Sequence, residues 1–173
     1  MNEWEKSLKN ITAFIFDYDG VMTDGTVYMD SNGDPLRTSN VKDSYALQLA
    51  SKLGYHVAVI SGAVVTNITK RLNMLGVHDV FTGIPDKVVQ LETFMGQYGL
   101  KPEQIVYVGD DIPDLPVMRM VGLAACPADA ALEIRQICHY ISDRPGGKGC
   151  VRDVIEQTLK AQGKWMTAEA YSW

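Results

Sequence analysis

Four groups of polar residues in this chain have the types and spacing that phosphoryl chemistry requires. They are Asp17-Tyr18-Asp19-Gly20, Ser61-Gly62, Asp86-Lys87, and Gly109-Asp110-Asp111 with Asp114 three residues further on. Carboxylates brought together repel one another unless a cation compensates, and Mg²⁺ prefers oxygen ligands. The sequence therefore predicts a magnesium site in which Asp17 and Asp110 are the best ligands.

The same groups supply the parts of a phosphoryl transfer. A carboxylate at Asp17 beside a metal can attack a phosphoryl group and form an aspartyl-phosphate. Asp19, two residues on, should point to the same edge and could protonate the leaving oxygen. Ser61 and Gly62 could hold phosphate oxygens through a hydroxyl and backbone N–H groups at a helix start, and Lys87 could offset the charge.

Each group also has an ordinary structural explanation. Asp17 and Asp19 could belong to an exposed turn, Ser61-Gly62 could be a helix N-cap, and Lys87 could lie on a solvated helix face. Asp111 and Asp114 could be acids that the helix dipole favours in a first turn. The joint occurrence of all these groups, in this order, favours a functional site.

Short apolar runs alternate with helix-period segments along the chain. The runs that predict strands are 11–16, 56–60, 80–82, 105–108, 121–125 and 139–142. The segments that predict helices are 44–53, 64–75, 87–98, 114–120, 128–137 and 150–162. This alternation predicts an α/β fold with a doubly wound, Rossmann-like parallel sheet. Ligands of such sheets bind beyond the carboxyl ends of the strands, where the four polar groups fall.

Two segments depart from the alternation. Residues 26–39 carry an Asn32-Gly33 turn between extended segments, which predicts an inserted β-hairpin. The tail 163–173 contains Trp165, Tyr171 and Trp173, although chain ends are usually polar. The tail could pack on a neighbouring subunit, cover its site as a lid, or dock on its own chain.

Length, composition and charge narrow the class of protein. The 173 residues are 46% hydrophobic and 21% charged, which predicts one globular domain over 1–173. Its 16 Lys and Arg against 21 Asp and Glu give a net charge of −5, so we expect neither nucleic acid nor a membrane as a partner. Cys126, Cys138 and Cys150 lack metal-ligand spacing and suggest thiols in a reducing compartment. No signal peptide or run of about 20 apolar residues is evident, so we expect a cytoplasmic protein.

The four motifs resemble the signature motifs of the haloacid dehalogenase superfamily of phosphatases. The stretches 16–25 (FDYDGVMTDG) and 109–118 (GDDIPDLPVM) more closely resemble its small branch without a cap domain. That branch dephosphorylates ulosonic acid phosphates such as 3-deoxy-D-manno-octulosonate 8-phosphate. The match extends over about residues 11–155, most of the chain.

The resemblance implies a role for each matching residue. Asp17 would be the nucleophile and Asp19 the acid/base, with Mg²⁺ held by Asp17, Asp110 and the main-chain carbonyl of Asp19. Ser61 and Lys87 would hold the phosphoryl group, and Asp111 and Asp114 would act around the metal. The resemblance also implies a homotetramer in which the hairpin packs between subunits, so that a neighbour completes the active site.

Several positions depart from the branch or have two explanations. Ala63 stands where the octulosonate phosphatases usually carry an arginine, and a nine-carbon, neuraminate-like ulosonic acid 9-phosphate is therefore an alternative substrate. Ser44-Tyr45-Ala46 replaces a glycine-rich helix start, and Ser39 replaces a common aromatic. Arg71 matches the branch and could meet the substrate carboxylate, or lie exposed on its helix. Lys42 and Arg37 would suit either an acidic sugar or a subunit interface.

Two alternatives belong to other classes. A receiver-type signalling module also combines a doubly wound sheet with a phosphorylated Asp, Mg²⁺ and a lysine. In a receiver, however, the paired acids end one strand and the acceptor ends a later one, whereas Asp17 and Asp19 lie together. A degenerate, non-enzymatic partner is the other alternative, but every catalytic position is filled.

Overall fold

The structure is a computed structural model that describes residues 3–64 and 66–173. Its strands are β1 (Ala13–Phe16), β2 (Tyr28–Met29), β3 (Pro35–Leu36), β4 (His56–Ile60), β5 (Asp79–Phe81), β6 (Ile105–Val108), β7 (Leu123–Cys126) and β8 (Tyr140–Ile141). Its α-helices are α1 (Glu3–Ser7), α2 (Val41–Lys52), α3 (Thr66–Met74), α4 (Lys87–Tyr98), α5 (Leu115–Met118), α6 (Leu132–Ile137) and α7 (Cys150–Ala161). Short 3₁₀ segments span Leu8–Asn10, Pro102–Gln104, Ile112–Asp114 and Ala168–Tyr171.

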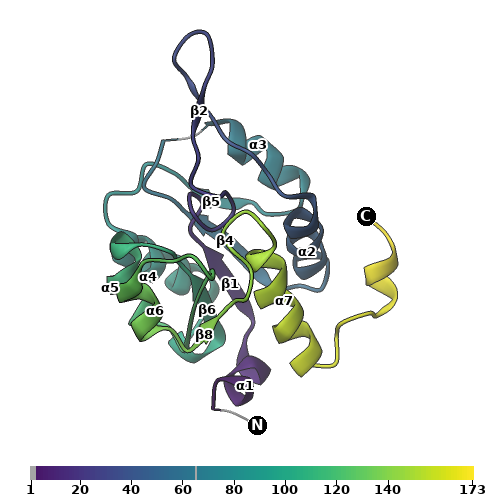
Figure 1. Cartoon of the computed structure of the whole chain (residues 1–173). Helices are drawn as coiled ribbons and strands as arrows, with labels where there is room; N and C mark the ends of the chain where they lie inside the picture. Colours follow the sequence, from purple (N-terminus) through teal and green to yellow (C-terminus); the bar gives the residue numbers. More distant parts are fainter. Residues whose placement is uncertain (1–2, 65) are drawn as a thin grey trace.

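Six parallel strands form the central sheet in the order β5-β4-β1-β6-β7-β8 (Figure 1). The chain first winds outward from β1 through β4 to β5, and then crosses back to β6 on the other side of β1. The order of the strands therefore reverses between β1 and β6, which is where ligands bind in doubly wound sheets. The predicted fold class is confirmed, and no cap domain is built by residues 3–64 and 66–173.

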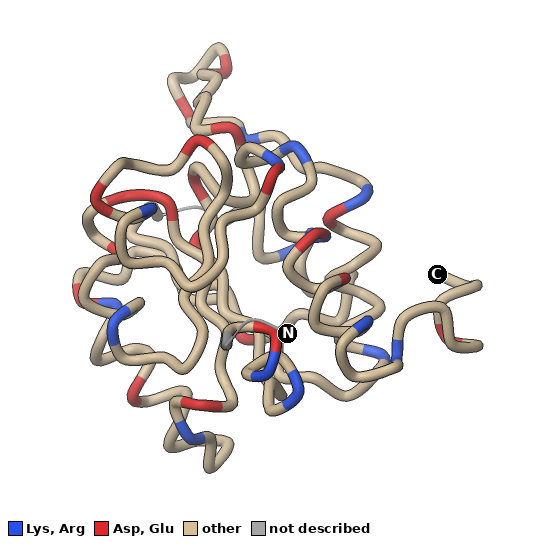
Figure 2. Tube along the Cα trace, turned by 60° about the horizontal axis from the view of Figure 1, so that its bottom comes forward, with Lys and Arg blue, Asp and Glu red and all other residues tan. Residues whose placement is uncertain are grey.

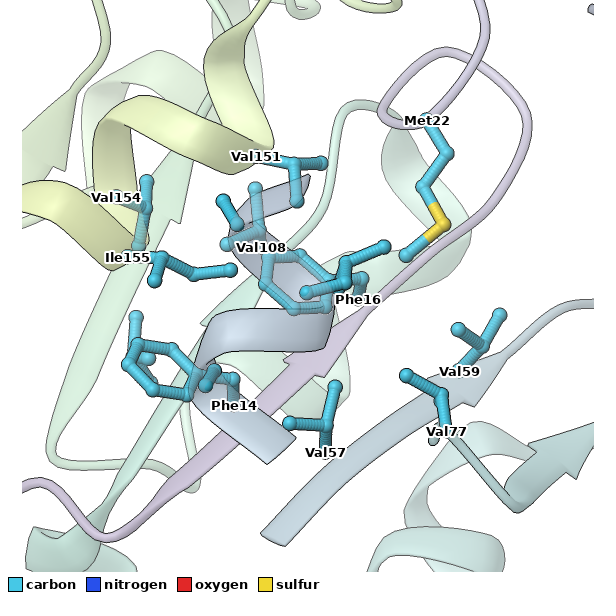
Figure 3. Close-up of a cluster of buried hydrophobic side chains, with 14 of the residues drawn as sticks. Phe14, Phe16, Met22, Val57, Val59, Val77, Val108, Val151, Val154 and Ile155 are labelled. Atoms are coloured by element: carbon cyan, nitrogen blue, oxygen red, sulfur yellow. The ribbon is translucent and has the colours of Figure 1, made fainter. Parts of the chain in front are cut away.

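The side chains of β1 alternate between two hydrophobic cores. Phe14 and Phe16 face the core that α2, α3 and α7 cover, whereas Ala13 and Ile15 face the core under α4, α5 and α6. Figure 3 shows the first core, where both phenylalanines lie close to valines of the neighbouring strands and to α7. Because both faces of β1 are buried, the strand reads as an uninterrupted apolar run.

Element bounds differ from the predictions mainly at the chain reversals. β1 starts at Ala13 instead of residue 11, because Ile11 N–H bonds to the Leu8 carbonyl and closes a 3₁₀ turn. The helix predicted over 128–137 is only Leu132–Ile137, since Ala131 N–H bonds to the Asp110 carbonyl at 2.8 Å. The helix predicted over 64–75 is observed as Thr66–Met74, and its residue 65 lies outside the described residues. The sequence did not predict α1.

The predicted hairpin is present, with β2 and β3 antiparallel. Its turn is wider than an Asn-Gly turn, because Met29 pairs with Pro35. Asp30 organises the turn: its carboxylate accepts from Asn32 N–H at 2.8 Å and from Asp34 N–H at 2.9 Å. The hairpin projects from the sheet at the end where the active-site loops lie (Figure 1).

The aromatic tail docks on α2 of its own chain. Trp173 contacts the Tyr45 ring edge-on, with centroids 5.8 Å apart, and Tyr45 Oη donates to the Ala170 carbonyl at 2.6 Å. Arg152 lies over the Trp165 ring. Within one chain, the tail therefore docks on its own chain.

Among the described helices, none is long and apolar enough to cross a membrane.

Candidate active site

The candidate site lies at the switch point between β1 and β6. Asp17 follows β1, and its N–H bonds to the Val108 carbonyl at the end of β6; Asp110 follows that strand after one glycine. Figure 2 shows acidic segments gathered on the loops at the hairpin end of the molecule. The carboxylate oxygens of Asp17, Asp110 and Asp114 all lie within 4.8 Å of one another.

Two glycines allow the loops to approach this closely. Gly20 has a φ of +82°, and a Cβ there would lie 1.9 Å from Asp110 Oδ2. A Cβ on Gly109 would lie 2.5 Å from the Asp114 side chain. Any other residue would push the carboxylates apart, so both glycines are required by the geometry of the site.

Asp17 is held by one backbone and one side-chain contact. Its Oδ1 accepts from Tyr18 N–H at 2.7 Å, and its Oδ2 lies 2.9 Å from Lys87 Nζ. Burial and the charge of Asp114 raise the pKa of Asp17 to about 7, although Lys87 opposes the shift. An additional cation is therefore needed to keep this carboxylate ionised as a nucleophile.

Asp110 is a second buried carboxylate whose ionised form is disfavoured. Burial and the charge of Asp17 raise the pKa of Asp110 to about 7. Asp114, in contrast, accepts hydrogen bonds from Lys87 Nζ at 2.7 Å, Tyr107 Oη at 2.8 Å and Asp110 N–H at 3.1 Å. Asp114 is thus already satisfied by the protein, whereas Asp17 and Asp110 require a cation. The donor set fits Mg²⁺, with these two carboxylates as the available ligands.

Lys87 supplies a positive charge beside Asp17 and Asp114 from the protein itself. It is the first residue of α4, follows the N-cap Asp86, and has a side chain only 8% exposed. Although burial opposes the shift, the charges of Asp114 and Asp17 raise the pKa of Lys87, so it stays protonated. Its ammonium group bridges the carboxylates of Asp17 and Asp114, and both Lys87 and Asp17 line the pocket described next.

An open pocket of about 280 Å³ lies above these groups. Its lining residues are Asp17, Asp19, Ser61, Gly62, Ala63, Lys87, Asp110, Asp111 and Pro113. Ser61 follows β4, and its Oγ accepts from Ala63 N–H at 3.2 Å. Since α3 begins five residues later, Ser61 is not the N-cap of that helix. Seven of the residues predicted from sequence are therefore brought to one pocket.

Asp19 is paired with the hairpin. Arg37, just after β3, donates from Nε to Asp19 Oδ1 at 2.7 Å and from Nη2 to Oδ2 at 2.8 Å. The Asp19 side chain is 32% exposed, whereas that of Arg37 is 7% exposed. From the sequence, Arg37 is expected to suit an acidic sugar or a subunit interface; its contact with Asp19 is not predicted.

The remaining predicted residues lie around or outside the pocket. Asp111 lines it and accepts from Ile112 N–H at 2.8 Å, which starts a 3₁₀ turn. Arg71, at the end of α3, lines a small cavity against α2, and Lys42 lines a separate groove beside α7. Within one chain, neither Arg71 nor Lys42 reaches the phosphate pocket, and their substrate roles stay predictions.

Tyr107 is a residue of the site that the sequence motifs do not include. It lies in the middle of β6, is fully buried, and donates from Oη to Asp114. Burial and the charge of Asp114 raise its pKa well above the usual range, so it stays a hydrogen-bond donor. The available signal was a tyrosine inside an otherwise aliphatic strand, because a buried hydroxyl needs a partner.

The site combines a pair of aspartates after β1, a lysine at the start of α4 and an acidic loop after β6. On a doubly wound sheet to which the described residues add no cap, this combination defines a hydrolase of the haloacid dehalogenase superfamily. No family model matches the chain. Over 155 residues it is 38% identical to the 3-deoxy-D-manno-octulosonate 8-phosphate phosphatase of Yersinia pestis, covering 90% of this chain and 83% of that relative. The chain belongs to the 3-deoxy-D-manno-octulosonate 8-phosphate phosphatase family.

Solved structures agree with this assignment. A crystal structure of the Moraxella catarrhalis 3-deoxy-D-manno-octulosonate 8-phosphate phosphatase, described with a magnesium ion, a phosphate ion and KDO, matches with a TM-score of 0.92. The identity is 32%, over 95% of both chains. A Legionella pneumophila structure described as a superfamily subfamily III A hydrolase has a TM-score of 0.93 at 32% identity, over 99% of this chain and 93% of that one. The predicted family is confirmed, and the receiver and non-enzymatic alternatives gain no support.

Proposed function

We propose that this protein is a Mg²⁺-dependent phosphatase that hydrolyses 3-deoxy-D-manno-octulosonate 8-phosphate to the free sugar acid and phosphate. The observation that carries the proposal is the convergence of Asp17, Asp110 and Lys87 at the switch point of the sheet. The names of the relatives support the substrate. We treat the chain as one phosphatase domain over 1–173, with the hairpin at 26–39 and the tail at 163–173 as its additions.

Asp17 acts as the nucleophile. Its carboxylate oxygen attacks phosphorus, the bond from phosphorus to the sugar oxygen breaks, and an aspartyl-phosphate forms on Asp17. Asp19, which lines the same pocket, gives a proton to the departing sugar oxygen. Asp19 then takes a proton from the water that attacks the aspartyl-phosphate, which releases phosphate and restores Asp17.

The other pocket residues bind and orient the phosphoryl group. Lys87 places a positive charge beside Asp17, and the Ser61 hydroxyl and Gly62 N–H offer donors from the loop after β4. Asp114 holds Lys87 in place, and Asp111, next to Asp110, lines the pocket. The carboxylates of Asp17 and Asp110 and the Asp19 carbonyl would hold Mg²⁺, which would supply positive charge between the phosphate and the nucleophile.

Ala63 keeps a second substrate in consideration. It lines the pocket where the branch usually has an arginine, so one contact with the sugar acid is missing in this chain. A nine-carbon ulosonic acid 9-phosphate is therefore the alternative substrate. Arg71 and Lys42 would contribute to either substrate only if assembly brings them near a neighbour's pocket.

A substrate panel tests the function. With Mg²⁺ present, phosphate release is measured from octulosonate 8-phosphate, from a neuraminate-like 9-phosphate and from D-glucose 6-phosphate. We expect the highest kcat/KM for octulosonate 8-phosphate. We expect no turnover by Asp17→Asn, and none by the unchanged protein in EDTA. A preference for the 9-phosphate would replace the substrate. Equal rates on glucose 6-phosphate would remove the sugar-acid assignment altogether.

We also propose a homotetramer in which the hairpin packs against neighbouring subunits. The hairpin exposes four apolar side chains, Val27, Tyr28, Met29 and Leu36, and each is more than 40% exposed. Clustered apolar exposure on a projecting element favours an interface. Light scattering of Met29→Asp against the unchanged chain tests this, since a smaller assembly is expected; an unchanged mass would contradict the role of the hairpin.

A cytoplasmic location completes the proposal. It is supported by three cysteines that are all free thiols, as expected in a reducing compartment. Fractionation of cells that produce the protein should recover the activity with cytoplasmic markers; recovery with the membrane or the extracytoplasmic fraction would contradict this location.

A further inference from the structure

Arg37 has a buried nitrogen that the protein does not use. The Nε and Nη2 groups are both taken by Asp19, but Nη1 has no hydrogen-bond partner within residues 3–64 and 66–173. The side chain as a whole is 7% exposed. Buried polar groups are nearly always hydrogen-bonded, so a cationic donor left over beside an active-site carboxylate points to an oxygen acceptor on a ligand.

The direction of this donor is fixed. A guanidinium group is planar and rigid, and its two bonds to Asp19 set the orientation of the third nitrogen. Asp19 lines the phosphate pocket and accepts from Arg37 through both carboxylate oxygens, while Arg37 itself is not among the lining residues. Because Asp19 serves the leaving oxygen in the proposed reaction, the part of the substrate nearest to Arg37 is the leaving sugar.

The surrounding charge favours an anionic group. Arg71 lines a small cavity together with Tyr18, the residue before Asp19. Arg37 has Asp19 as its partner, but Arg71 forms no ion pair with any residue that the structure describes. The guanidinium group of Arg37 is only partly engaged by one carboxylate, so an anionic oxygen is the acceptor that suits Nη1 best.

We propose that Arg37 is a specificity-determining residue that grips Asp19 with two nitrogens and binds the carboxylate of the leaving sugar acid with the third. This inference rests on the proposed function and adds a recognition contact to it. The contact gives the chain a way to recognise an acidic sugar although Ala63 provides no charge. It also makes Arg37 a positioning residue for Asp19, because the fork fixes the orientation of that carboxylate.

The two roles have separate kinetic signatures. Loss of positioning lowers kcat for every phosphate monoester, whereas loss of the carboxylate contact raises KM only for acidic sugars. The experiment uses Arg37→Gln and Arg37→Lys, with the exposed Arg119→Gln as a control for the loss of one charge. Octulosonate 8-phosphate and D-glucose 6-phosphate are the substrates. The free sugar acid and inorganic phosphate are the inhibitors, so that binding is measured apart from turnover.

For Arg37→Gln we expect KM for octulosonate 8-phosphate and Ki for the free sugar acid to rise about tenfold or more. KM for glucose 6-phosphate and Ki for inorganic phosphate should change less than about twofold, while kcat falls for both substrates. Arg37→Lys should keep part of the affinity, because it retains the charge but not the fork. Arg37→Lys also serves as the test variant if Arg37→Gln does not fold. Arg119→Gln should match the unchanged protein.

Two results would overturn the proposal. One is an unchanged Ki for the sugar acid in the folded Arg37 variants. The other is a rise in KM of the same size for glucose 6-phosphate as for the acidic substrate. The failure of the proposed function looks different, because the unchanged protein itself would then show no preference for the acidic sugar over glucose 6-phosphate.

Discussion

The Tyr107 hydroxyl donates a 2.8 Å hydrogen bond to Asp114 Oδ1, the same oxygen that accepts from Lys87 Nζ at 2.7 Å. This contact connects the core of the sheet to the catalytic pocket. Tyr107 is fixed by the packing of β6, so it fixes Asp114 and, through Asp114, the ammonium group beside the nucleophile. The packed strand thereby holds the Lys87 ammonium group in place.

Tyr107→Phe tests this connection. The change leaves the aromatic packing intact but removes one donor from a buried carboxylate, which should cost about 1–2 kcal/mol of unfolding free energy. We expect kcat to fall about tenfold with little change in KM, because Lys87 is less well held. Urea unfolding and steady-state kinetics measure the two effects.

Tyr98→Phe is the matched control, because Tyr98 Oη donates to Asp79 at 2.7 Å, outside the pocket lining. It should leave kcat unchanged. Equal kcat values for Tyr107→Phe and the unchanged protein would show that Tyr107 serves packing alone.

Gly20→Ala tests the close approach of the two acidic loops. The added Cβ would meet Asp110 Oδ2, and the φ of +82° disfavours any side chain. Gly25→Ala is the control, since Gly25 has a φ of +78° but no atom within 4 Å. We expect Gly25→Ala to cost about 1 kcal/mol from the backbone and Gly20→Ala about 1–3 kcal/mol more. Mg²⁺ titration by calorimetry should show weaker binding for Gly20→Ala only; equal affinities would contradict the arrangement.

The raised pKa values of Asp17 and Asp110, both about 7, predict how pH acts on the metal-free protein. The folded state holds these protons up to about pH 7, whereas the unfolded chain releases them near pH 4. The unfolding free energy should therefore decrease as the pH rises from about 4 to 7. Asp43, with a pKa raised to about 6 by burial, contributes in the same direction.

Mg²⁺ should reverse this loss, because it stabilises the ionised carboxylates. We expect the ion to raise the melting temperature by several degrees at pH 8 and by less at pH 5, as scanning calorimetry in EDTA and in Mg²⁺ would measure. In Asp110→Asn the dependence on Mg²⁺ should disappear. A larger stabilisation by Mg²⁺ at pH 5 than at pH 8 would contradict the ligand assignment.

The sequence predicted the catalytic residues that lie next to a strand end in the chain. Asp17 directly follows an apolar run and Asp110 follows another after one glycine, so parallel pairing of β1 and β6 was enough to bring them together. The pairing of Arg37 with Asp19 depends on how the chain returns from the projecting hairpin to the loop after β1, and no local pattern encodes that path. Residues 128–131 have helical composition, but the Ala131 N–H bonds to the Asp110 carbonyl. Because of this tertiary hydrogen bond, α6 begins only at Leu132.

Asp17 is the centre of the account, since both half-reactions pass through its carboxylate. The most direct test is phosphate release from octulosonate 8-phosphate in Mg²⁺ by Asp17→Asn, with a urea-unfolding curve on the same sample. The exposed Asp143→Asn serves as the control for the loss of a charge. We expect release to fall by about 10³-fold or more while the protein stays folded and Asp143→Asn keeps full activity. Substantial phosphate release by folded Asp17→Asn would contradict it.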